Sequence, residues 1–115
     1  IQGLGWVSTE NLFYNDQGYL LSHAPSTYKI PNVQDTPRVF NIELLKNDEN
    51  FINVRGTKAV GEPPLLLAIS AWTAINQALT HLPRYEKRYP EIKIPATSER
   101  VLRAMNPDRF KAWEA

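Results

Sequence analysis

The sequence of 115 residues contains no cysteine, one methionine and two histidines. Without cysteine, the chain has no disulfide scaffold, no thiolate zinc site and no iron–sulfur cluster held by its own side chains. The two histidines, His23 and His81, have no metal-binding residue at ligand spacing, so we expect no protein-ligated metal here. The Gly-x-x-x-x-Gly-Lys pattern for phosphate binding and the Gly-x-Ser-x-Gly pattern of serine hydrolases do not occur.

A long apolar run is also missing. The most apolar stretch, residues 65–79, is interrupted by four polar residues and is shorter than the ~20 residues that a membrane span needs. The chain opens at Ile1 without a charged-then-apolar signal pattern, which indicates a cut inside a longer chain. With the lack of cysteine, this favours a cytoplasmic protein and no membrane partner.

The charges nearly cancel, with a formal net charge of +1. Residues 1–80 hold five Lys/Arg and seven Asp/Glu, whereas residues 81–115 hold eight and five. A basic excess of that size is usual for a solvated surface, so we expect no nucleic-acid partner.

The first third of the chain predicts irregular structure around short elements. Residues 1–11 fit the end of a helix, weakened by two glycines. Two β-prone runs, residues 12–14 and 19–21, flank an Asn-Asp-Gln-Gly turn and predict a hairpin. Residues 22–37 contain three prolines and little periodicity, which predicts an ordered loop.

Two strands are predicted next. In residues 38–46 the side chains of Phe40, Ile42 and Leu44 share one face, as in a half-buried strand. Residues 51–55 follow a polar turn and predict a second strand, for which the first is the candidate pairing partner.

A long helix is predicted over residues 65–82. Pro63 and Pro64 favour a helix start, since a first-turn proline loses no intrahelical hydrogen bond, and Pro83 ends the helix. The helix is apolar on most faces, so we expect it to be buried.

The chain after Pro83 differs in composition and predicts a second region, residues 83–115, a basic tail after a first region of residues 1–82. Residues 83–95 predict an extended surface segment. Two short helices follow: Thr97 caps the first, with Glu99 in its first turn and an end near Met105, and Asn106-Pro107 starts the second, with Phe110 and Trp113. Together the elements predict an α+β fold.

Glu62 is the residue best placed for chemistry. It stands between a flexible Gly61 and a rigid Pro63-Pro64 pair at the start of a helix. Glycine lets a ligand approach the main chain, and a helix N-terminus offers free N–H groups to an anion. A structural interpretation is also open, in which the carboxylate only complements the helix dipole.

The string Lys-Ala-Val-Gly-Glu-Pro-Pro-Leu at residues 58–65 resembles the active-site loop of the xanthine dehydrogenase and aldehyde oxidase family. Residues 2–5 (Gln-Gly-Leu-Gly) and 25–31 (Pro-Ser-Thr-Tyr-Lys-Ile-Pro) resemble two other family segments in the same order. Residues 66–79 resemble the helix after the glutamate. The resemblance covers roughly residues 1–82 and identifies the chain as the C-terminal part of a molybdopterin-binding domain.

The resemblance implies a fragment of a molybdenum hydroxylase, most simply a xanthine dehydrogenase that converts hypoxanthine and xanthine to urate. The implied cofactor is molybdenum-molybdopterin, bound together with upstream segments. Glu62 is implied to be the general base that deprotonates the molybdenum-bound hydroxyl. Electrons would pass to iron–sulfur clusters and FAD elsewhere in the enzyme and then to NAD. The implied partners are the rest of the molybdenum subunit, the FAD/iron–sulfur subunit or domain, and a purine substrate.

Four further residues are implied to lie near the cofactor. Gly61 would let the main chain pass close to it, Val60 and Ala59 would line that approach, and Lys58 would contact it or lie on the surface. The residues that orient and sandwich the purine are expected outside this chain, so the isolated fragment should be inactive.

Two other functions stay open. One is an aldehyde oxidase or N-heterocycle hydroxylase of the same family, which residues outside this chain would distinguish. The other is a non-catalytic α+β interaction module that uses the basic tail with Tyr85, Tyr89 and Trp113, and that would fold as a stable, cooperative monomer.

Overall fold

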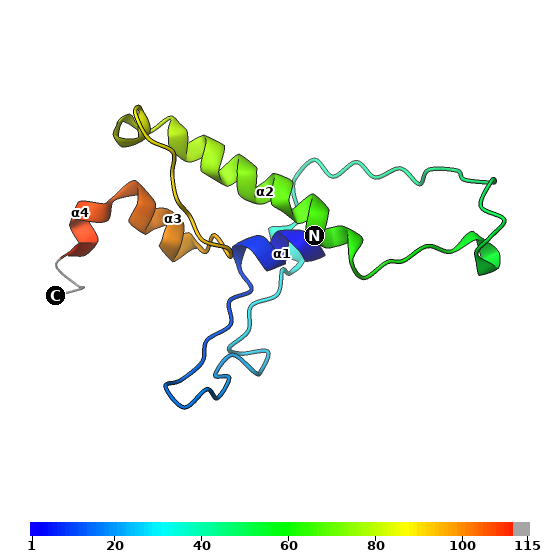
Figure 1. Ribbon diagram of the computed structural model, residues 1–115, viewed down its shortest axis with the longest axis horizontal. Helices are drawn as coiled ribbons and strands as arrows, with labels where there is room; N and C mark the ends of the chain where they lie inside the picture. Colours follow the sequence, from blue (N-terminus) through cyan, green and yellow to red (C-terminus); the bar gives the residue numbers. More distant parts are fainter. Residues whose placement is uncertain (112–115) are drawn as a thin grey trace.

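The computed structural model describes residues 1–111 and consists of helices joined by long loops (Figure 1). Within this part of the chain no strand forms, so the described residues do not bear out an α+β fold. None of the described helices is both long and apolar enough to cross a membrane. The elements, in chain order, are α1 (Gln2–Ser8), η1 (Val33–Asp35), η2 (Val54–Gly56), α2 (Pro63–Thr80), η3 (Pro83–Tyr85), α3 (Ser98–Met105) and α4 (Pro107–Phe110).

The long helix predicted after the two prolines is confirmed as α2, which begins at Pro63. Helix α1 lies beside the first turns of α2 (Figure 1). The two backbones approach closely at Gly3, where a Cβ would overlap the carbonyl oxygen of Pro64 and lie 2.9 Å from the Cβ of Ala68. Glycine is therefore needed at residue 3 for α1 to reach the start of α2.

The C-terminal half of α2 packs against the tail. Leu79, Ile92 and Ala96 form a buried apolar cluster. Trp72 donates its indole N–H to the carbonyl oxygen of Ile92 at 3.1 Å, which ties the helix to the tail. Asn76 is fully buried, and its side-chain amide donates to the carbonyl oxygen of Trp72 at 3.0 Å.

The prediction that residues 83–95 form an extended surface segment was wrong in part. They begin with the short helix η3, and Pro90 and Ile92 are buried. The segment packs against the apolar side of α2, where Ile92 contacts Leu79. Removal of this apolar surface from water stabilises the arrangement. The division of the chain at residue 82 stays a prediction.

Both short helices of the tail are confirmed. The Thr97 hydroxyl accepts the Arg100 N–H at 3.3 Å and caps α3, and Pro107 is the first residue of α4. Phe110 ends α4, while Trp113 lies outside the described residues. The amide of Ala96 also donates to the carbonyl oxygen of Val7, at 2.6 Å, so the tail is joined to α1.

The predicted hairpin forms only its turn. An isolated bridge joins Tyr14 to Leu20, and Gly18 adopts a φ of +82° in the turn. Residues 12–14 and 19–21 are not strands, and Phe13 and Tyr19 are exposed. A two-stranded ribbon is marginal without a third strand or a helix over its apolar face, and no described residue supplies one.

The strands predicted over residues 38–46 and 51–55 were also wrong. Both segments are loop, apart from η2, and residues 37–49 are exposed throughout. Figure 1 shows residues 37–62 as a wide excursion away from the helices. The alternation of Phe40, Ile42 and Leu44 marks an apolar face, but a strand needs neighbouring strands for its backbone hydrogen bonds.

The expected burial of α2 is wrong for its N-terminal half. Leu66 and Leu67 are each 74% exposed, and Leu65 and Ile69 are exposed as well. Only Ala68, Asn76 and Leu79 are buried along this helix. The described part of the chain covers one side of α2 at its start, and the other apolar sides face outward.

The loop of residues 22–37 is ordered, as predicted. The Tyr28 hydroxyl donates to the Glu10 carboxylate and so anchors the loop beside the end of α1. This hydrogen bond, together with partial burial and the negative charge of Glu10, raises the pKa of Tyr28 above its usual value. Further along, Asn32 and Asp35 cap η1 reciprocally.

Candidate functional site

Glu62 is the N-cap residue of α2. Its backbone has a φ of −89° and a ψ of −32°, and its carbonyl oxygen accepts the Leu65 N–H at 2.9 Å. The side chain makes no capping hydrogen bond and is exposed. The carboxylate therefore stands at the positive end of a five-turn helix without being used to close the helix end.

An open apolar groove lies in front of Glu62. Its volume is about 730 Å³, and its walls come from α1, from the loop before α2 and from the first turns of α2. Glu62 is the one charged residue in the lining, which consists of Trp6, Ala59, Gly61, Glu62, Pro63, Leu65, Leu66 and Leu67. A carboxylate in such a setting has apolar neighbours that exclude water once the open side is covered.

Gly61 faces open space. A Cβ built on it would meet no atom within 4 Å, so its main chain is accessible from the groove. A ligand in the groove can approach this backbone more closely than it could approach any residue with a side chain.

The other three predicted site residues divide into two groups. Ala59 lines the groove together with Gly61 and Glu62. Val60 is 81% exposed, and neither Val60 nor the exposed Lys58 belongs to the lining. The structure thus brings three of the five candidate residues together, while the roles of all five stay predictions.

Trp6 is the wall residue that the sequence interpretation missed. It reaches the groove because α1 packs on α2 at Gly3, and residues three apart on a helix share a face. The available signal was this spacing in the Gly-containing N-terminal segment. The exposed leucines at residues 65–67 were assigned to a buried core and instead form the opposite wall.

No group of three or more His, Cys, Asp or Glu side chains that could hold a metal occurs among residues 1–111. The groove offers apolar walls, an accessible backbone at Gly61 and one carboxylate.

Comparison with known proteins supports this interpretation. Residues 1–37 match the model of the molybdopterin cofactor-binding domain. The chain is 40% identical to a xanthine dehydrogenase of Dictyostelium discoideum, over 88% of this chain, and 40% identical to xanthine dehydrogenase 2 of Arabidopsis thaliana, over 97%. It is 35% identical to aldehyde oxidase 2 of Macaca fascicularis, over 98%. The chain belongs to the xanthine dehydrogenase and aldehyde oxidase family.

Within this family the chain is a segment of a molybdenum-cofactor-binding domain. It spans 8% of the length of the Dictyostelium relative and 9% of the Arabidopsis and macaque relatives. The match to the domain model includes Trp6 and ends before Glu62. The similarity to the Arabidopsis and macaque relatives covers 97 and 98% of the chain and so extends far beyond residue 37. The groove is therefore built partly by the matched domain segment and partly by the loop and helix that follow.

Proposed function

We propose that this chain supplies Glu62 as the general base of a molybdenum hydroxylase of the xanthine dehydrogenase type. The observation that carries the proposal is the position of Glu62, the one charged residue lining an apolar groove at the start of α2. Membership of a family of molybdenum-cofactor proteins supports it.

The residues around the groove fit a bound molybdopterin. Gly61 offers open backbone, Ala59 leaves space, and Pro63 restricts the direction of the chain on which Glu62 is mounted. The cofactor, when bound, supplies the oxygen nucleophile and takes up the electrons of the substrate. A Glu62 carboxylate oxygen accepts a proton from this nucleophile, and the loss of the proton activates the nucleophile. Glu62 later releases the proton to water.

The apolar surface around the site is proposed to be covered by the rest of the molybdenum subunit. Leu66 and Leu67 on α2 and Leu44, Leu45 and Ile52 in the loop are between 74 and 95% exposed. Large apolar side chains exposed in this number indicate surface that another part of a protein covers. The FAD and iron–sulfur centres and the transfer of electrons to NAD stay predictions from the resemblance. The cytoplasmic location stays a prediction from the lack of cysteine and of a signal pattern.

The proposed substrate is a purine, hypoxanthine or xanthine. The observation that favours it is that identity reaches 40% for several xanthine dehydrogenases and 34 to 35% for two aldehyde oxidases, while the mouse xanthine dehydrogenase/oxidase stands at 35%. An aldehyde oxidase is the second candidate, and turnover of aldehydes without turnover of xanthine by the complete enzyme would select it. An independent interaction module is disfavoured because the open face of α2 is unlike the surface of a self-contained module.

The test is Glu62→Gln in the complete enzyme, which keeps the size of the side chain and removes the proton acceptor. Loss of a positioned general base lowers kcat by about 10²–10⁴-fold. We expect a loss of this size with unchanged molybdenum and pterin content, measured by steady-state kinetics and metal analysis. Glu43→Gln is the matched control, because Glu43 is an exposed loop glutamate that does not line the groove.

Turnover of the Glu62→Gln enzyme within threefold of the unmodified enzyme would refute the role of Glu62. A loss of cofactor together with activity would instead assign Glu62 to binding. Equal losses in both variants would show a general sensitivity of the enzyme to these changes.

A further inference from the structure

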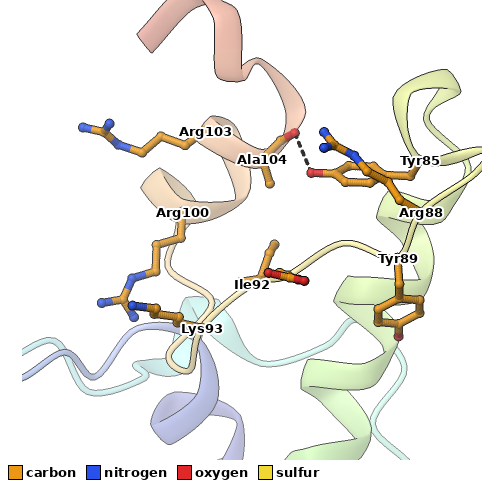
Figure 2. Close-up of a pocket in the computed structure, with 9 residues that line it drawn as sticks. Tyr85, Arg88, Tyr89, Ile92, Lys93, Arg100, Arg103 and Ala104 are labelled. Atoms are coloured by element: carbon orange, nitrogen blue, oxygen red, sulfur yellow. Dashed lines mark hydrogen bonds between the residues drawn. The ribbon is translucent and has the colours of Figure 1, made fainter. Parts of the chain in front are cut away.

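A second pocket lies between η3, the extended segment after it, and α3 (Figure 2), at the end of the molecule away from the loop excursion in Figure 1. Its volume is about 590 Å³. It shares no lining residue with the groove of Glu62, and the proposed function leaves it unexplained.

Cations dominate the lining. Arg88, Lys93, Arg100 and Arg103 all line the pocket, and Glu91 is the one acidic lining residue. Arg103 is further paired with Glu99 at 3.0 Å. The cations come from different segments of the tail: Figure 2 shows Arg88 beside Tyr85, and Lys93, Arg100 and Arg103 extending on the other side of the pocket. Their mutual repulsion is reduced when an anion enters.

Contacts within the chain hold three of the residues that line the pocket. Tyr85 donates its hydroxyl to the Ala104 carbonyl oxygen at 3.0 Å, and the Arg88 guanidinium lies 5.4 Å from the centre of the Tyr85 ring. Arg100 donates one N–H to the Pro95 carbonyl oxygen at 2.7 Å, which leaves an arginine further donors. Figure 2 shows Arg88 and Tyr85 across the pocket from α3. Arg88 and Arg100 are therefore held in place before any ligand arrives.

The geometry favours carboxylates from a protein over a phosphate. All five glycines precede Glu62, so no glycine-rich loop lies near the pocket to offer backbone N–H groups to a phosphate. The Arg100 N–H at the start of α3 is already used by the Thr97 cap. Separate cations beside Tyr85 and Tyr89 instead have the composition of a protein–protein contact, in which tyrosine and arginine are enriched.

We infer that this pocket docks an acidic segment, with at least two neighbouring Asp or Glu residues, from elsewhere in the complete enzyme. Most of such an enzyme lies outside this chain, since the chain spans 8 to 9% of its relatives. The carboxylates of the segment pair with Lys93 and Arg88 at the open side, and its backbone lies against Tyr89. The inference depends on family membership and is independent of the role of Glu62.

Zero-length coupling tests it. A carbodiimide joins a lysine amine to a carboxylate that touches it, and Lys93 is the one lysine in the lining. In the purified complete enzyme, digestion and mass spectrometry should find Lys93 joined to a peptide with at least two acidic residues. The yield should exceed by at least fivefold that of Lys87, an exposed lysine of the same segment outside the lining. It should fall severalfold between about 0.1 and about 1 M NaCl, as screening shortens the range of the charges.

Two variants complete the design. Arg88→Gln should lower the Lys93 yield severalfold, and Lys93→Arg should abolish coupling while keeping the charge. Coupling of Lys93 at or below the Lys87 level, or only to Glu91 or Glu99, would overturn the inference. Loss of coupling in 10 mM inorganic phosphate, without loss in sodium chloride of the same ionic strength, would also overturn it in favour of a phosphate site.

Discussion

The two ends of α2 differ sharply in how they are covered. At the C-terminal end, Leu79 is 4% exposed and packs with Ile92 and Ala96 of the tail. At the N-terminal end, Leu66 and Leu67 are each 74% exposed beside Glu62. The chain therefore completes the core of one half of the helix and leaves the half with the candidate site open. A groove that two segments of an enzyme share is open in each segment taken alone. The groove beside Glu62 is open in this chain.

The largest effects are expected from two leucine truncations in the complete enzyme, one in each half of α2. Leu79→Ala should lower the free energy of local unfolding by about 2–5 kcal/mol, because it leaves a cavity in the tail cluster. Amide hydrogen exchange over residues 72–96 measures the loss. Leu66→Ala should cost a similar amount over residues 63–69 if the rest of the subunit covers this face.

The outcome of Leu66→Ala separates two structures of the enzyme. Unchanged exchange over residues 63–69 in that variant would mean that the open half of α2 also faces solvent in the complete enzyme. The proposal of a covered groove would then be wrong, whatever the effect of Leu79→Ala.

A second pair compares two glycines near the open half. Gly3→Ala should destabilise the α1–α2 contact by about 1–3 kcal/mol, because its Cβ overlaps the Pro64 carbonyl oxygen. Gly61→Ala meets no atom within 4 Å and should leave the exchange of α2 unchanged. If the cofactor passes close to residue 61, the second variant should still lose cofactor content. Normal cofactor content and turnover in Gly61→Ala would exclude that close passage.

The smallest expected effect is that of Tyr28→Phe, which tests whether α1 is held independently of α2. Loss of the hydrogen bond to Glu10 should cost about 1 kcal/mol locally, seen as faster exchange over residues 24–31 with α2 unchanged. Because the folded pKa of Tyr28 is raised, its contribution is complete below the unfolded tyrosine pKa and is lost as pH rises through the folded value. The unmodified enzyme should therefore approach the exchange of the variant at high pH. Faster exchange along α2 in the variant would instead couple the two regions.

Local signals predicted the helices well. Pro63, Thr97 and Pro107 act within one turn of their own position, so the sequence alone located the starts of α2, α3 and α4. The same signal placed Glu62 at a helix start, where the structure has it. Its chemical role stays a prediction, since that role depends on groups outside this chain.

Features that depend on distant contacts were not predictable in the same way. The alternation at Phe40, Ile42 and Leu44 predicted a half-buried strand, but a strand forms only beside another strand, and no described residue provides one. Trp6 in the groove wall and Ile92 in the core are placed by packing against residues that are distant in the sequence. A single sequence carries no direct record of such pairs.

The hydrogen bond from Ala96 to Val7 has a consequence for the order of events on the ribosome. Its two residues are separated by most of the chain, so α1 cannot acquire this partner until the tail has been translated. At about 5–20 residues per second, that delay lasts several seconds. Helix α1 therefore leaves the ribosome before its hydrogen-bond partner at Ala96 has been made, and this contact forms only after the tail has followed.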